Sequence, residues 1–79
     1  MSDRYVQLRP REHELVPLLA RGLTEADCAE EMGISARTVK GIADTLRFKL
    51  GVKTRREIPM AYWRVTGIDP FPVDEEVAT

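Results

Sequence analysis

The chain has 79 residues, 43% of them hydrophobic and 32% charged, which is enough for one small domain but not for a deep cleft between two layers. One cysteine cannot form an internal disulfide, and one histidine without a Cys or His cluster offers neither metal-ligand spacing nor a catalytic set. We therefore expect no enzyme, no catalytic residue, no metal and no other cofactor. Apolar runs fall short of the roughly 20 residues that span a bilayer, and the N-terminal residues lack the layout of a signal peptide, so we expect a cytoplasmic protein without a membrane partner.

The net charge of −1 is unevenly distributed along the chain. Residues 1–60 hold eleven Lys and Arg against nine Asp and Glu, a net of +2, whereas residues 61–79 hold one Arg against four acids, a net of −3. The acidity therefore belongs to the C-terminal end. Because the rest is only mildly basic, long-range attraction to phosphate is weak, and any DNA binding depends on where individual cations lie.

The first helix is predicted over residues 10–21, where Pro10 suits the first turn. Pro17 removes one backbone hydrogen bond inside this helix, so we expect either a kink near residues 13–17 or a tolerated, exposed proline. His13 is expected to be solvated, because a lone histidine without a partner rarely has a function.

Two more helices are predicted over residues 25–32 and 36–50, joined by a tight turn. Thr24 and Ser35 are N-cap residues in the right places to start them. Cys28 lies on the apolar face of the shorter helix, so we interpret it as a small buried hydrophobe rather than a reactive thiol.

The helix over residues 36–50 has two different faces. Its predicted inward stripe consists of Val39, Ile42 or Ala43, Leu46 and Leu50. Its outward face carries Arg37, Lys40, Gly41 and Asp44, with Arg47 and Lys49 near the far end. Helices in this position often enter the major groove of DNA, although a merely solvated polar face has the same pattern.

The fourth helix is predicted over residues 55–66, because Thr54 and Glu57 have capping-box spacing and Gly67 can end it. Pro59 interrupts its first part. Either the first turn is distorted there, or the regular helix starts late, near the proline.

A domain over residues 1–67 is then followed by an extended, acidic, proline-containing tail over residues 68–79. Trp63, Phe71 and Val73 are apolar enough to hold part of this tail on a surface, either the chain's own or a partner's.

Between Leu8 and Glu57 the chain contains the motifs Pro-Arg-Glu, Leu-Leu-Ala-Arg-Gly-Leu-Thr, Ile-Ser-Ala-Arg-Thr-Val-Lys and Lys-Leu-Gly-Val. This run resembles the LuxR/GerE-type helix-turn-helix domain family over about 50 residues. The resemblance implies an all-α fold of four helices, with the third in the major groove and the fourth as a dimerisation surface.

The resemblance also implies a set of DNA contacts. Thr38 would touch phosphate, Lys40 and Gly41 would face base edges, and Asp44 would occupy a further base-facing position. The residues that would lie near the DNA backbone are Lys53, Thr54 and Arg55. Residues 41–45 depart from the family, which commonly has longer polar side chains there, so Lys40 is the obvious residue left to contact bases.

Two hypotheses about function follow. The first is a stand-alone transcriptional regulator that binds double-stranded DNA as a homodimer, with further backbone contacts from Arg37 and Arg56. The residues of its dimer seam would be Ile58, Ala61, Tyr62 and Val65.

The second hypothesis keeps the fold and changes the partner. The weak net charge, and Ile42 and Ala43 in place of polar residues, favour a protein-interaction module that binds a transcription factor or an RNA polymerase subunit. The contact would be made through the third helix or the tail. A related hypothesis is an intramolecular brake, in which acidic residues of the tail compete with phosphate: Asp74, Glu75 and Glu76.

Overall fold

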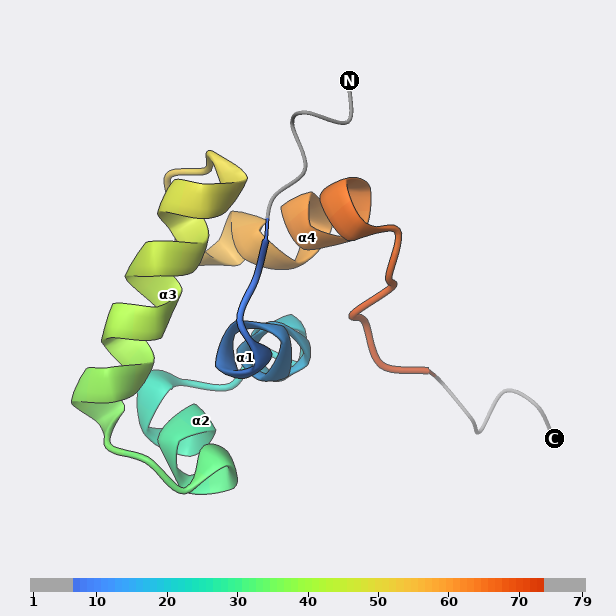
Figure 1. Cartoon of the computed structure of the whole chain (residues 1–79). Coiled ribbons are helices and arrows are strands. Elements are labelled where there is room, and N and C mark those ends of the chain that lie inside the picture. Colours follow the sequence, from blue (N-terminus) through green and yellow to red (C-terminus); the bar gives the residue numbers. More distant parts are fainter. Residues whose placement is uncertain (1–6, 74–79) are drawn as a thin grey trace, which may run out of the picture.

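The computed structural model describes residues 7–73, and every regular element in that range is helical (Figure 1). The elements are α1 (Pro10–Ala20), α2 (Glu25–Met32), α3 (Ala36–Leu50), the single 3-10 turn η2 (Arg55–Glu57) and α4 (Ile58–Thr66). The predicted all-α fold class is confirmed, and the bounds of α2 and α3 coincide with the expected ranges. None of the helices in the described range is long and apolar enough to cross a membrane.

Local caps mark where α2 and α3 begin and where α2 ends. Thr24 Oγ1 accepts the Asp27 N–H at 3.1 Å, and Ser35 Oγ accepts the Thr38 N–H at 3.1 Å, as predicted for two N-caps. Between the two helices Gly33 takes the left-handed conformation, with φ of 69°, which a residue with a side chain rarely adopts. The turn that presents α3 is therefore determined by residues next to it in the sequence.

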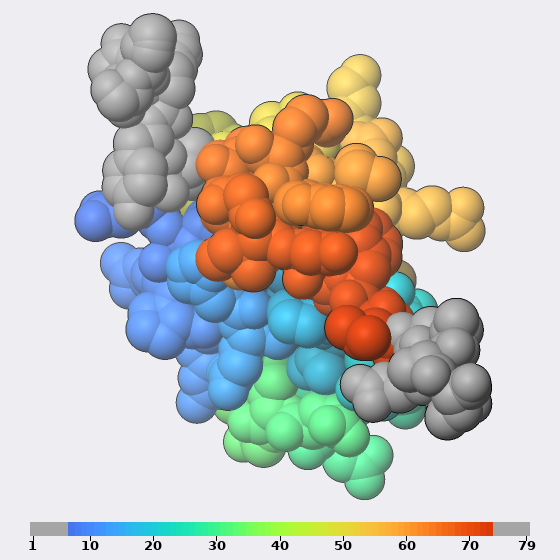
Figure 2. All heavy atoms as spheres, turned by 90° about the vertical axis from the view of Figure 1, so that its right-hand side faces the viewer, coloured from blue at the N-terminus to red at the C-terminus, as the bar shows by residue number. Residues whose placement is uncertain are grey.

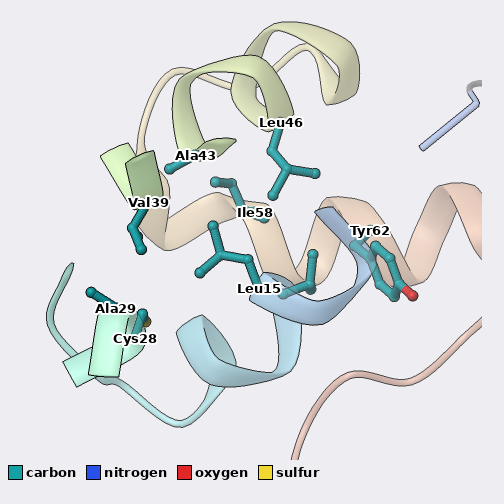
Figure 3. Packing of buried hydrophobic residues seen from close by; sticks show 9 residues of the cluster. Leu15, Cys28, Ala29, Val39, Ala43, Leu46, Ile58 and Tyr62 are labelled. Atoms are coloured by element: carbon teal, nitrogen blue, oxygen red, sulfur yellow. The ribbon is translucent and has the colours of Figure 1, made fainter. Parts of the chain in front are cut away.

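The core forms where α1, α2, α3 and α4 meet. Figure 3 shows Val39, Ala43 and Leu46 of α3 in one cluster with Leu15 of α1 and Ile58 of α4. Full burial of a side chain of this size contributes about 1.5–3 kcal/mol, so this cluster holds α3 in one orientation. The inward position left open by the sequence belongs to Ala43, which is 3% exposed, while Ile42 is only half-buried. Cys28 is also fully buried as predicted, and burial raises the pKa of its thiol.

Glu12 is a buried charge that ties α1 to α3. Its carboxylate accepts the Arg9 N–H at 2.8 Å and the Lys49 ammonium at 2.9 Å. Burial acts to raise the pKa of Glu12, but these two donors outweigh it and the pKa lies below the ordinary value of 4.5. The expectation that Lys49 lies on the outward face of α3 is therefore wrong, because its side chain turns toward α1.

Two expectations about α1 have different outcomes. Pro17 is exposed within a helix that continues to Ala20, which agrees with a tolerated proline. His13 is not solvated: it is half-buried, with Nδ1 2.9 Å from the Tyr62 hydroxyl and the two rings in a T-shaped contact. That prediction is wrong because Tyr62 lies 49 residues further along the chain, outside any local pattern.

The start of α4 differs from the prediction. The turn η2 occupies the expected first turn, and the α-helix begins at Ile58 with Pro59 in its first turn, where a missing N–H costs little. The predicted capping box does not form, because Thr54 makes no side-chain cap and the Glu57 carboxylate instead accepts the Lys53 N–H at 3.1 Å. The late start is thus the correct alternative.

Between Gly67 and Val73 the chain lies along its own surface (Figure 2). The ring of Phe71 packs on that of Trp63, with centroids 5.9 Å apart, and Pro70 is buried. Of the two surfaces considered for the apolar residues of the tail, the chain's own is the one occupied, although Val73 is 78% exposed. The acidic residues of the brake hypothesis lie outside the described residues: Asp74, Glu75 and Glu76.

Candidate nucleic-acid interface

The outer face of α3 is open, because α1, α2 and α4 all lie to one side of this helix (Figure 1). Every residue predicted to contact DNA from α3 is exposed: Arg37, Thr38, Lys40, Gly41 and Asp44. The residues predicted to follow them near the DNA backbone are exposed as well: Lys53, Thr54, Arg55 and Arg56. The fold therefore leaves the whole predicted contact set accessible to a partner.

Arg47 connects these two groups. Its guanidinium donates to Asp44 Oδ1 at 2.7 Å and to the Lys53 carbonyl at 2.9 Å. The hydrogen bond from Arg47, with the nearby charge of Lys40, lowers the pKa of the Asp44 carboxyl. Arg47 thus compensates the one negative charge on this face and holds the Lys53 segment against the end of α3.

The sequence placed Arg47 near the far end of the outward face but not among the predicted DNA contacts. Its spacing of three from Asp44 was an available signal for an ion pair on one helix. Its bond to the Lys53 carbonyl was not predictable, because it depends on the path of the chain after α3.

The segment after α3 is anchored at both ends. The Lys53 N–H is held by Glu57, and Arg55 pairs with Glu25 at the start of α2, with Nη1 and Oε2 2.8 Å apart. Beside this segment is an open hollow of about 420 Å³, lined by Thr54, Arg55 and Arg56 together with Leu19, Gly22 and Leu23. These contacts therefore hold the segment that carries Lys53, Arg55 and Arg56 in one position against α2 and the start of α4.

The predicted cations of the interface differ in how far their charges are already paired. Within residues 7–73, Arg55 forms an ion pair, while four others form none: Arg37, Lys40, Lys53 and Arg56. Exposed ion pairs are worth little, so even Arg55 can exchange its partner for a phosphate at small cost. This surface can accept the phosphates of a nucleic-acid backbone.

The predicted dimer seam on α4 is largely wrong. Ile58, Ala61 and Tyr62 are at most 4% exposed, because they pack into the chain's own core, and only Val65 remains accessible at 46%. Helix α4 is apolar on more than one side, so its sequence pattern could not tell the core face from the outer one. The side of α4 that faces away from the core instead presents Met60 and Trp63, which with Arg64 line an open, mostly apolar hollow of about 260 Å³.

The large exposed hydrophobic residue of α3 was missed from the sequence. Phe48 is 86% exposed and lies seven residues after Gly41, on the same outer face. Its position outside the inward stripe was the signal that could have identified it.

Comparison with known proteins connects this surface to a family. Residues 6–61 match the family described as bacterial regulatory proteins, luxR family. The matched range takes in α1, α2, α3 and η2 in full and the first four residues of α4.

Individual relatives match the same part of the chain. Oxygen regulatory protein NreC of Staphylococcus aureus is 35% identical over 57 residues, which are 72% of this chain and 26% of that protein. HTH-type transcriptional activator RamA of Corynebacterium glutamicum is 41% identical over 59 residues, which are 75% of this chain and 21% of that protein. The chain spans about a quarter of the length of these relatives, and no solved structure matches it significantly.

Proposed function

Because the chain belongs to the luxR family of bacterial regulatory proteins, we propose that it regulates transcription by placing α3 in the major groove of double-stranded DNA. The observation that carries this proposal is the accessible outer face of α3 with its exposed Lys40 and Arg37. The similarity to RamA, which is named a transcriptional activator, supports the same function.

The proposed roles follow from what each side chain can bond. Lys40 is the fifth residue of α3, at the start of its second turn, and donates to base edges, while Gly41 beside it has no side chain and allows the backbone to approach. Thr38, whose hydroxyl lies 2.9 Å from that of Ser35, bonds a phosphate at the start of the helix. Further phosphate contacts come from Arg37, Lys53, Arg55 and Arg56.

We also propose that two copies of the chain bind two half-sites through the outer face of α4. The support is the exposed apolar pair Met60 and Trp63, which lie three residues apart on one side of α4, since removing such apolar surface from water is favourable. A twofold dimer would present its two α3 helices about one turn of DNA apart, to a site with matching symmetry.

The proposal is tested by selecting duplexes from a random pool and measuring the affinity of the preferred site against salt concentration. Lys40→Ala should lower this affinity about 10-fold and relax the preference at one base pair, because one base contact is lost. Arg56→Ala should instead weaken binding to all duplexes alike and reduce the salt slope by about 1. Arg11→Ala serves as the control, since it removes an exposed cation from α1.

If wild-type protein binds no duplex even at low salt, the proposal is rejected. The protein-interaction alternative, with a transcription factor or RNA polymerase subunit as partner, would then be favoured.

The dimer is tested by sedimentation equilibrium. Met60→Asp should weaken self-association and the affinity for a two-half-site duplex, because a charge would enter the seam. Val73→Asp, at an apolar residue that is 78% exposed in the tail, is the matched control. Equal effects of the two substitutions would place the seam elsewhere.

A further inference from the structure

Phe48 has the highest exposed fraction of the exposed large hydrophobic residues in the described range, at 86%. The others all belong to α4 and the segment after it: Met60, Trp63, Val65, Ile68 and Val73. Phe48 is therefore separated from the apolar surface that we assign to the dimer, and it needs its own explanation.

Its place on α3 aligns it with the proposed DNA-facing residues. Gly41, Asp44, Thr45 and Phe48 stand at positions i, i+3, i+4 and i+7 of the helix, and all four are exposed. This spacing puts them on one side of the helix, over a length of about 10 Å. Homeodomain recognition helices use four residues at the same spacing to contact bases in the major groove.

The other three residues of this row are shorter than Phe48, and two of them already form hydrogen bonds within the chain. Gly41 has no side chain, and the Asp44 carboxylate is bonded to Arg47 at 2.7 Å. The Thr45 hydroxyl donates back to the Gly41 carbonyl at 3.1 Å. Phe48 is the one member of the row with a long side chain that points outward and is mostly free of contacts.

A phenyl ring restricts the possible partner. It cannot donate to a base edge or attract a phosphate, but it can pack against the C5-methyl group that thymine presents in the major groove. Gly41 on the same side would help, because its missing side chain lets the helix backbone lie closer to the bases. The fold itself does not require this glycine, since a Cβ added there would meet nothing within 4 Å.

We infer that Phe48 is a specificity-determining residue that recognises one thymine of the target site through its 5-methyl group. The inference rests on the proposed function, since it requires α3 in the major groove. Phe48 follows Lys40 by eight residues, or about 12 Å along the helix, so this thymine lies roughly three base pairs from the base contacted by Lys40.

The test replaces each thymine of the selected duplex in turn by deoxyuridine, which removes only the methyl group. Wild-type protein should lose affinity about fourfold at one thymine, the change expected for one buried methyl group. Phe48→Ala should bind the unmodified duplex about fourfold more weakly than the wild type does. Its affinity should not change further when deoxyuridine replaces that thymine. Lys40→Ala should bind more weakly overall and still respond to it.

The controls separate recognition from folding. Phe48→Ala should keep the thermal unfolding midpoint of the wild type, because the ring is 86% exposed. Phe48→Leu should retain part of the response to the methyl group, and Val73→Ala, which removes an exposed apolar residue of the tail, should bind as wild type.

The possible failures are distinguishable. If Phe48→Ala binds like the wild type while Lys40→Ala binds weakly, the inference is overturned and the proposed function stands. The same holds if Phe48→Ala responds to deoxyuridine as the wild type does, or if the selected site has no thymine in that region. Wild-type protein that binds no duplex would overturn both.

Discussion

Val39, Ala43 and Leu46 on the inner face of α3 are at most 3% exposed, whereas Gly41 and Phe48 on its outer face lie in solvent. The inner residues contact side chains from α1 and α4, so their size and shape are set by the chain's own core (Figure 3). The outer residues have no such requirement: a Cβ at Gly41 would meet only open space, and the ring of Phe48 is not covered. The choice of residue on the outer face therefore points to a partner rather than to the fold.

The largest expected difference between the two faces is in stability. Leu46→Ala should cost about 2–5 kcal/mol of unfolding free energy, because it leaves a cavity at a fully buried site. Phe48→Ala removes a larger side chain but should change this free energy by less than about 0.5 kcal/mol, since nothing in the core depends on it. Urea denaturation of both variants measures this, and similar losses would contradict the division of α3 into two faces.

A charge next to the core is expected to have the next largest effect. Glu12→Gln should cost about 1–3 kcal/mol, because it removes the charged partner of Lys49 from a site that is 4% exposed. Glu14→Gln, on the exposed side of the same helix, is the control and should have little effect.

The same substitution makes a prediction for pH. The pKa of Glu12 is lower in the folded chain than its ordinary 4.5, so its ionised form stabilises the fold above that pH. This contribution is lost as the pH falls below 4.5 and through the folded value. The free-energy difference between wild type and Glu12→Gln, measured by urea denaturation at a series of pH values, should therefore shrink in acid. A constant difference would mean that the cost comes from packing alone.

The smallest expected effect has the opposite sign. Gly41→Ala should stabilise the chain by up to about 1 kcal/mol, because alanine is the better helix former and its Cβ meets no neighbour. It should also weaken binding to the selected duplex if the backbone of α3 approaches the bases there. Gly33→Ala is the contrasting variant, since its φ of 69° makes a side chain unfavourable, and it should destabilise. A Gly41→Ala variant that unfolds more easily would show that this glycine has a structural role.

Part of the candidate site was predictable because its signals are local. Ser35 caps α3 by bonding an N–H three residues away, and the outward positions of Lys40 and Gly41 follow from the helical period once Val39 is assigned to the core. The helical period also places Phe48 on the outer face, but no motif drew attention to it. Its importance became apparent only from its exposure and from the contacts that engage Asp44 and Thr45.

The sequence by itself determined the predicted helices, the turn before α3 and the inward stripe apart from the choice between Ile42 and Ala43, since each depends on residues within about four positions of one another. Only the tertiary structure decided which apolar side of α4 enters the core, where Lys49 points and what His13 contacts. Lys49 and His13 bond residues that lie 37 and 49 positions away in the sequence. When a helix is apolar on more than one side, the helical period does not show which side is the core side, and only the packing of the whole chain decides it. For the same reason Ile58, Ala61 and Tyr62 belong to the core, and the surface proposed for a second chain is the opposite side of α4.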